Sequence, residues 1–378
     1  MRTVLFVLLL AALSACSTVS NLFGKKSEAP PLPKINEAFK PLVLWRADVG
    51  GSSGDSVFVP AVDRNAIFAA SQEGILSRFE SLKGRRVWKV DTLHRLSAGV
   101  GVGDNLVIVC AETGEVMAFD EAGKPLWKFQ IAGELLSVPR AADGVAVVRT
   151  ADGRIFGLDD RSGKQLWIYQ YTTPALSIRS YAGVEIAQDT VFAGFAGGKL
   201  VSLDLKTGSV NWESSVSQPH GTTELERIAD VSSLPIVDEL QVCAAAFQGR
   251  LSCFDIGKGE LIWSKNISSF SGMIVDQRNF FVADDQDDVL SLDSGSGATA
   301  WKQTGLAGRQ ITRPYVQGSY VVVGDGQGYV HFLRRSDGEI VARTKTDDSP
   351  ILSHPVYLNS DMFLVQTRKG KLYAMAAP

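Results

Sequence analysis

From residue 42 onward the chain consists of short apolar-rich runs, separated by turns that contain glycine. The clearest run is GEVMAFD, residues 114–120, which is followed by Gly123 and then by a run that contains Trp127. Side chains that alternate between two environments over four to eight residues predict a β-strand, and glycine supplies the positive φ that tight hairpins need. Each run of this kind therefore predicts a pair of antiparallel strands joined by a tight turn.

This pattern recurs eight times along the chain. Its first turn residue, glycine in seven copies and aspartate in one, stands at positions 74, 114, 153, 198, 249, 288, 328 and 370, with spacings of 39 to 51 residues. A period near 40 is typical of a β-propeller with four strands per blade, and two further strand-like runs precede each repeat. We therefore expect an all-β fold, an eight-bladed β-propeller with four antiparallel strands per blade, over residues 41–378.

The eighth repeat ends before its tryptophan-bearing strand, and a run at the start of the chain, residues 42–47, has the missing character. We expect this N-terminal strand to complete the last blade and close the ring, because closure removes the exposed edges of an open stack of sheets. In that arrangement only blade seven lacks the tryptophan, with Ala342 in its place. The seven tryptophans at this position are residues 45, 88, 127, 167, 212, 263 and 301.

The tryptophan-bearing repeat resembles the quinoprotein-type, or PQQ-like, propellers over nearly all of residues 42–376. The resemblance implies that each tryptophan lies on the outer strand of its blade, wedged against the next blade, and is structural. Enzymes of that superfamily are typically longer, bind calcium in the central funnel and often carry two adjacent cysteines, which this chain lacks. A PQQ-dependent or other ligand-binding periplasmic propeller enzyme is the alternative interpretation of the chain.

Composition and motifs give little support to catalysis or nucleic-acid binding. The chain has 38 Lys and Arg against 41 Asp and Glu, so it lacks the basic excess that phosphate neutralisation requires. Its four histidines lie far apart, and neither a His-Glu-x-x-His motif nor a Gly-x-Ser-x-Gly elbow occurs. The glycine-rich segment 324–328 and the acidic segment 284–288 occupy hairpin positions, so we interpret both as turns. We predict a non-enzymatic protein with no catalytic, cofactor-binding or metal-binding residues.

The N-terminus has the features of a bacterial lipoprotein leader. Arg2 precedes an apolar run at residues 4–13, which is too short to span a bilayer and ends in Leu-Ser-Ala-Cys. This sequence resembles the lipobox, which implies a signal peptide at residues 1–15 and lipid attachment, including palmitate, at Cys16. Ser17 is not the aspartate linked to inner-membrane retention, so we expect outer-membrane attachment on the periplasmic side. Residues 16–40, rich in Ser, Pro and Lys, then form a flexible tether.

Three cysteines remain after Cys16, and the oxidising periplasm permits disulfides. Cys243 and Cys253 flank the turn at Gln248 and Gly249 on neighbouring strands, whereas Cys110 lies elsewhere. A two-residue turn would place the two cysteines one position out of register, facing opposite ways, so we expect them to stay unpaired. A different hairpin register would allow them to meet.

Two insertions break the regular repeat. The distance from the tryptophan to the next repeat is 25 to 28 residues in most blades, but 31 after Trp167 and 37 after Trp212. The extra residues fall within 169–187 and 213–235, and insertions in such repeats map to loops on one face, so we expect two loops side by side at one rim. The first contains Leu176, Ile178 and Arg179, and the second is rich in charge.

Apolar side chains ringed by charges are typical of a protein-binding patch. The second insertion contributes Glu224, Glu226, Arg227 and Asp230 to this pattern. The alternative is that the leucine and isoleucine of the first insertion merely pack their loop onto blade four.

Together the lipobox, the tether, eight blades, LSIR at 176–179 and ELERIADV at 224–231 resemble the BamB family. These are the propeller lipoproteins of the outer-membrane β-barrel assembly machinery, the BAM complex. The resemblance implies a monomeric, non-catalytic scaffold, without a cofactor, that binds the periplasmic POTRA domains of the barrel-forming subunit and supports β-barrel insertion. It further implies indirect association with the other lipoproteins of the machinery.

On matching positions, the resemblance implies that Leu176, Ile178 and Arg179 form one contact cluster. Asp230 is the centre of a second cluster, with Glu226 and Arg227 in support. Ser232 stands where family members can carry a second acidic residue.

Overall fold

The structure is a computed structural model that describes residues 30–54, 56–276 and 278–377. The predicted signal peptide, 1–15, and the predicted lipid-attachment residue, Cys16, lie outside the described residues. Residues 33–378 form one compact unit, and every regular element that the structure describes in it is a β-strand. None of the described residues forms a helix long and apolar enough to cross a membrane.

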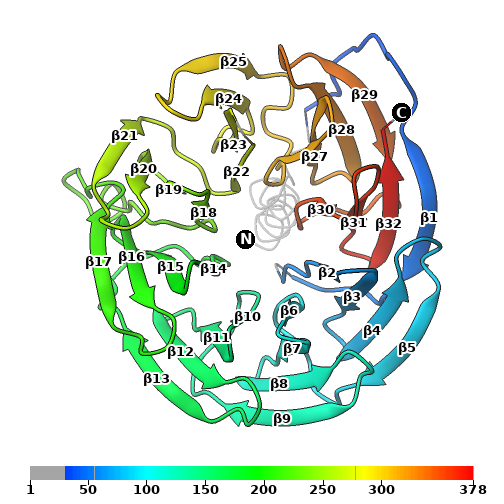
Figure 1. Cartoon of the computed structure of the whole chain (residues 1–378). Helices are drawn as coiled ribbons and strands as arrows, with labels where there is room; N and C mark the ends of the chain where they lie inside the picture. The colour runs from blue at the N-terminus through cyan, green and yellow to red at the C-terminus, as the bar shows by residue number, and fades with distance from the viewer. Residues whose placement is uncertain (1–29, 55, 277, 378) are drawn as a thin grey trace, which may run out of the picture. The chain divides into compact units, whose positions relative to one another are not determined.

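Eight four-stranded antiparallel sheets surround one axis as the blades of a propeller (Figure 1). In each blade the first strand lies nearest the axis and the fourth lies on the outer wall. Blade one comprises β2 (Ala61–Asp63), β3 (Ala66–Ala70), β4 (Ile75–Glu80) and β5 (Arg86–Asp91). Blade two comprises β6 (Gly101–Gly103), β7 (Leu106–Cys110), β8 (Glu115–Asp120) and β9 (Pro125–Gln130). Blade three comprises β10 (Arg140–Ala142), β11 (Val145–Arg149), β12 (Arg154–Asp159) and β13 (Gln165–Gln170). Blade four comprises β14 (Val184–Ala187), β15 (Thr190–Phe195), β16 (Lys199–Asp204) and β17 (Val210–Ser215).

The remaining blades follow the same order around the ring. Blade five comprises β18 (Ile236–Val237), β19 (Gln241–Ala245), β20 (Leu251–Asp255) and β21 (Leu261–Lys265). Blade six comprises β22 (Gly272–Val275), β23 (Asn279–Ala283), β24 (Val289–Asp293) and β25 (Thr299–Gln303). Blade seven comprises β26 (Tyr315–Gln317), β27 (Tyr320–Gly324), β28 (Tyr329–Arg334) and β29 (Ile340–Lys345). Blade eight comprises β30 (Val356–Tyr357), β31 (Phe363–Gln366), β32 (Lys371–Ala376) and the N-terminal β1 (Leu42–Asp48). The predicted eight-bladed fold and its closure by the N-terminal strand are both confirmed.

The core is divided into eight hydrophobic clusters, one between each pair of neighbouring blades. Strand β7 shows how alternation produces them: Ile108 packs toward blade three, whereas Val107 and Val109 pack toward blade one. All five β7 residues are buried, because the second strand of a blade is covered on both faces. The blades are therefore held together by the same strands that form them.

All seven tryptophans lie on the outer strand of their blade, as the resemblance implied. Each indole N–H donates a hydrogen bond of 2.6 to 3.1 Å to a backbone carbonyl of the next blade. The ring of Trp127, for example, lies against Gly163, which has a φ of 69°, and a Cβ atom there would come within 2.6 Å of the indole. This glycine is therefore required both by its backbone conformation and by the tryptophan that covers it.

Blade seven carries Ala342 at the tryptophan position for a structural reason. A tryptophan there would dock on the turn between the third and fourth strands of blade eight, but the fourth strand is β1, which comes from the other end of the chain. No such turn therefore joins them. Phe39 instead packs against Tyr320 and Phe332, with ring centroids 4.8 and 5.5 Å apart, in the cluster that contains Ala342.

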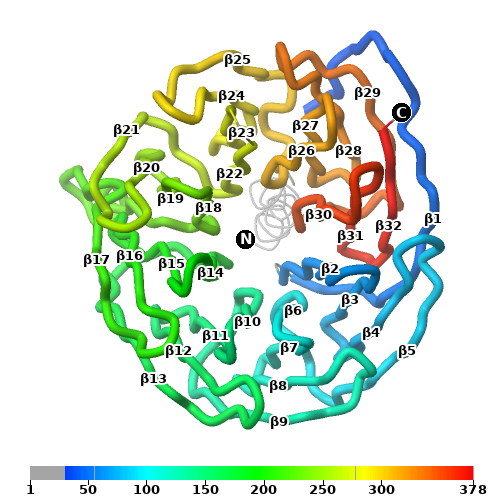
Figure 2. Tube along the Cα trace, viewed as in Figure 1, coloured from blue at the N-terminus to red at the C-terminus, as the bar shows by residue number. Residues whose placement is uncertain are grey.

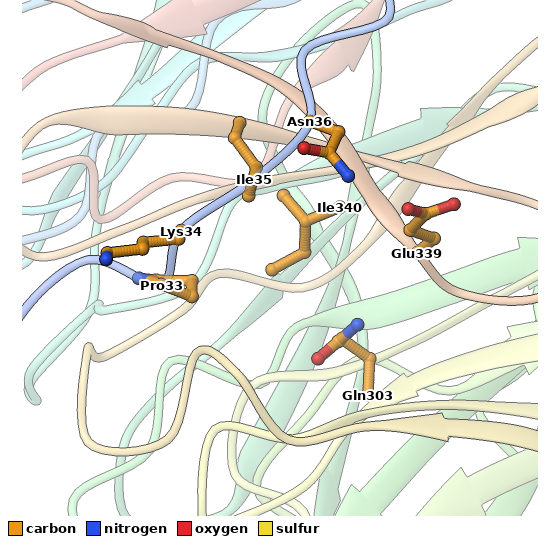
Figure 3. Close-up of a pocket in the computed structure, with 7 residues that line it drawn as sticks. All are labelled: Pro33, Lys34, Ile35, Asn36, Gln303, Glu339 and Ile340. Atoms are coloured by element: carbon orange, nitrogen blue, oxygen red, sulfur yellow. The ribbon is translucent and has the colours of Figure 1, made fainter.

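Phe39 belongs to a segment, residues 33–40, that lies along β29. The backbone N–H of Ala38 donates to the carbonyl of Val341 at 2.8 Å, and Arg343 donates to the carbonyl of Pro33. Ile35 packs with the cluster between blades six and seven, beside a surface pocket of about 360 Å³ (Figure 3). These residues were predicted to belong to the flexible tether, but they pack against the propeller, so the compact unit begins at Pro33 and not at residue 41.

The expectation that Cys243 and Cys253 stay unpaired is wrong. The turn between β19 and β20 spans the five residues 246–250 and not two, so Cys243 lies directly opposite Cys253 in the register. Directly paired residues of antiparallel strands point to the same face, and the two cysteines form a disulfide. Cys110 is buried and free, and burial raises the pKa of its thiol to about 12.

Candidate functional site

Two loops that connect neighbouring blades form the candidate site, which we call the partner rim. Loop one, residues 171–183, joins β13 to β14, and loop two, residues 216–235, joins β17 to β18. The hydroxyl of Ser180 donates to the carbonyl of Ser232 at 2.9 Å, which joins the loops directly. The two insertions therefore lie side by side, as their positions in neighbouring repeats predicted.

Asp230 is the residue that holds the partner rim together. One carboxylate oxygen accepts a hydrogen bond from the Ile178 N–H at 2.8 Å, and the other accepts one from the Gly197 N–H at 2.9 Å. Its side chain thus joins loop one, loop two and the turn between β15 and β16. Asp230 is only 3% exposed, so in this conformation it positions the loops and presents little surface of its own.

The predicted residues of loop one are accessible to different degrees. Leu176 is 40% exposed and Arg179 is also exposed, whereas Ile178 is half-buried. Arg179 forms an ion pair with Glu134, which lies on the connection between blades two and three. Because Leu176 is absent from the core clusters that the structure defines, the alternative that it merely packs the loop onto blade four is not supported for this residue.

The tip of loop two is a turn stabilised by its own polar groups. The Glu226 carboxylate accepts hydrogen bonds from the N–H groups of Thr222, at 2.8 Å, and Thr223, at 3.1 Å. These bonds to the Thr223 and Thr222 backbone lower the pKa of Glu226 to about 2. Arg227 lies 3.8 Å from Glu224, so the two exposed side chains form an ion pair one turn apart. Glu226 therefore shapes the turn, while Arg227 and its neighbours face solvent.

Two residues were not predicted, one in loop two of the partner rim and one that contacts loop one. Leu225, at the tip of loop two, is 67% exposed, so the partner rim has a second exposed apolar side chain in addition to Leu176. The signal was present in the sequence, since a leucine flanked by Glu224 and Glu226 cannot bury itself easily in a charged turn. Glu134 gave no signal, because only the three-dimensional arrangement brings its loop beside Arg179.

The segments interpreted as turns do form turns. Residues 325–328 join β27, which ends at Gly324, to β28, and Asp325 is buried there against Arg309 and His331, at 2.7 and 2.9 Å. Residues 284–288 join β23 to β24, and Asp284 and Asp288 lie 3.4 and 2.8 Å from the ammonium group of Lys302, on β25. Among the described residues, no group of three or more His, Cys, Asp or Glu side chains is placed to hold a metal ion.

Comparisons with known proteins found a family model and relatives that carry the same name. The family model described as outer membrane protein assembly factor BamB matches residues 72–303. The protein of that name from Nitrosomonas eutropha is 43% identical over 382 residues, covering 97% of this chain and 93% of its own length. Its namesake from Escherichia coli is 29% identical, covering 96% and 95% respectively.

Solved structures extend the comparison to the fold. The crystal structure of BamB from Moraxella catarrhalis matches with a TM-score of 0.82 at 25% identity and covers 89% of this chain and 100% of that one. A quinohemoprotein alcohol dehydrogenase from Comamonas testosteroni matches with a TM-score of 0.72 at 13% identity, covering 92% and 78%, which shows a common propeller fold alone. With the eight blades, the docked tryptophans and the near full-length relatives, the chain belongs to the family of BamB outer membrane protein assembly factors.

Proposed function

We propose that the protein is a non-catalytic scaffold lipoprotein that supports the folding and insertion of β-barrel proteins into the outer membrane. Relatives across almost the whole chain carry the name of outer membrane protein assembly factor, which supports this role. The partner is the periplasmic POTRA region of the barrel-forming subunit, and contact with the other lipoproteins of the machinery is indirect. The propeller acts as a monomer.

The observation that carries the proposal is the construction of the partner rim. Asp230 fixes two loops, and the fixed loops expose Leu176, Leu225 and Arg179 together with the half-buried Ile178. Apolar side chains on a pre-ordered surface, surrounded by charge, lose little conformational entropy when a partner covers them. Glu226 and Arg227 complete the charged border.

Binding of the mature chain to the isolated POTRA region tests the site. Leu176→Asp and Arg179→Glu are expected to weaken binding, by about fivefold or more for an interface residue worth over about 1 kcal/mol. Leu82→Asp and Arg161→Glu are matched controls, since both side chains are exposed on hairpin turns of other blades. Unchanged affinity in both rim variants, with their folding intact, would contradict the assigned site.

Membrane attachment needs its own test, because Cys16 lies outside the described residues. We expect the Cys16→Ala variant to lose incorporation of labelled palmitate and to leave the outer-membrane fraction. The wild-type chain should remain in that fraction on its periplasmic side. Uptake of PQQ with calcium and oxidation of an alcohol by the purified chain would instead support the enzymatic alternative.

A further inference from the structure

Four charged or titratable residues form a cluster near the ring axis, separate from the partner rim. Arg140 lies on β10 and Glu185 on β14, the innermost strands of blades three and four. Arg313 and His354 lie just before β26 and β30, the innermost strands of blades seven and eight (Figure 2). We call these four residues the axial cluster.

The axial cluster contains more positive than negative charge. Glu185 pairs with Arg140 at 3.4 Å, whereas the buried Nε of Arg313 has no hydrogen-bond partner among the described residues. The charges of Arg140 and Glu185 nevertheless act on Arg313, although its strand belongs to a blade across the ring. Burial, Arg313 and Arg140 lower the pKa of His354 well below its usual value, so at neutral pH the imidazole is uncharged. The axial cluster thus contains one carboxylate and two guanidinium groups.

A buried hydroxyl group without a partner lies beside Arg313. Ser233 is 5% exposed, and among the described residues its Oγ finds no hydrogen-bond partner; the same is true of the buried Nε of Arg313. Both side chains lie against Gly272: a Cβ atom there would be 2.9 Å from the Cβ of Ser233 and 3.6 Å from the Cδ of Arg313. Buried polar groups are normally paired, so two unpaired donors beside one glycine indicate a place where a polar group binds.

We propose that the axial cluster binds a small oxyanion, through the Arg313 guanidinium and the Ser233 hydroxyl. Glu185 balances only one of the two positive charges, and a bound anion neutralises the other. The planar guanidinium group of Arg313 can donate hydrogen bonds to either a carboxylate or a phosphate group. Arg140 adds attraction without a direct bond. Arg313 is itself partly exposed, so a small anion can reach its guanidinium group from solvent. Ser233 belongs to loop two of the partner rim, but the anion site does not rest on the proposed function.

Titration of the mature chain with sodium phosphate, and separately with sodium acetate, tests the site at constant ionic strength set with sodium chloride. We expect at least one of the two anions to raise the melting temperature in a saturable way and to give a measurable Kd by calorimetry. Arg313→Gln should weaken that binding by about tenfold or more, since hydrogen bonds to charged groups are the strong ones. Arg161→Gln is the matched control, because it removes the same charge from an exposed turn of blade three.

Ser233→Ala provides a second variant in case Arg313→Gln fails to fold, and it should weaken binding by a smaller factor. A response to phosphate alone assigns the site to phosphate groups, and a response to acetate assigns it to carboxylates; either supports the proposal. The proposal is overturned if neither anion has an effect beyond that of chloride. It is equally overturned if folded Arg313→Gln, or Ser233→Ala where the former is unfolded, binds as tightly as the wild type.

Discussion

Replacing Asp230 with alanine should open the partner rim without unfolding the propeller. The substitution removes the acceptor of two backbone hydrogen bonds, from Ile178 at 2.8 Å and from Gly197 at 2.9 Å. An unpaired buried donor costs about 1 to 3 kcal/mol, and water can partly replace the bond to half-buried Ile178, so we expect about 2 to 4 kcal/mol. Because 1.36 kcal/mol corresponds to a factor of ten, a loss of about 2 kcal/mol or more raises the equilibrium constant for opening of the loops by about 30-fold or more.

Hydrogen exchange at the two amides measures this effect directly. In Asp230→Ala the Ile178 and Gly197 amides should exchange about 30-fold faster or more, while the strands of blade four keep their protection, because the opening is local. Affinity for the POTRA region should fall although Leu176 is unchanged. Asp204→Ala is the matched control, since that carboxylate caps only its own turn in the same blade. Unaltered exchange at both amides, or full affinity despite rapid exchange, would refute this reasoning.

Three further predictions concern other parts of the molecule. The pKa of Glu226 is lowered from 4.5 to about 2, so the stabilisation that this carboxylate gives to the loop-two turn is complete above pH 4.5 and is lost as the pH falls through about 2. NMR chemical shifts of that turn should therefore titrate near pH 2 in the wild type and should not do so in Glu226→Gln. Phe39→Ala should lower the free energy of unfolding in urea by about 1 to 3 kcal/mol, because the ring is only half-buried, whereas Phe39→Leu should lose less. Replacing Cys243 and Cys253 together by serine should destabilise the chain by up to about 3 kcal/mol, from the ten-residue separation that the bond closes; reductant should lower the stability of the wild type and not of the variant.

Features that repeat along the chain could be predicted from the sequence. The regular spacing of the glycine and tryptophan positions predicted the eight blades and the closing strand, because every blade must bury the same faces against its neighbours. Ala342 marked the exception, but its explanation required Phe39, which lies in a segment without any periodicity. The disulfide was mispredicted because the length of one turn decides which residues face each other, and a glycine alone does not reveal that length.

The candidate site was predictable in place but not in detail. The insertions after Trp167 and Trp212 located the two loops, since only these intervals exceed the regular repeat. The sequence could not show that Asp230 is buried, because an aspartate in a charged loop is exposed far more often than not. Its burial depends on two amide groups that come from other segments of the chain.

The substitution of Phe39 for a tryptophan makes one of the eight joints of the ring different from the others. Seven joints are each locked by an indole from an outer strand, whereas the joint between blades seven and eight depends on residues that precede β1. A protease that trimmed the chain to residue 41 would therefore leave all thirty-two strands in place and weaken this joint, together with the contact that Ile35 makes between blades six and seven. The joint between blades seven and eight, which no indole locks, would then be the point at which the ring opens first.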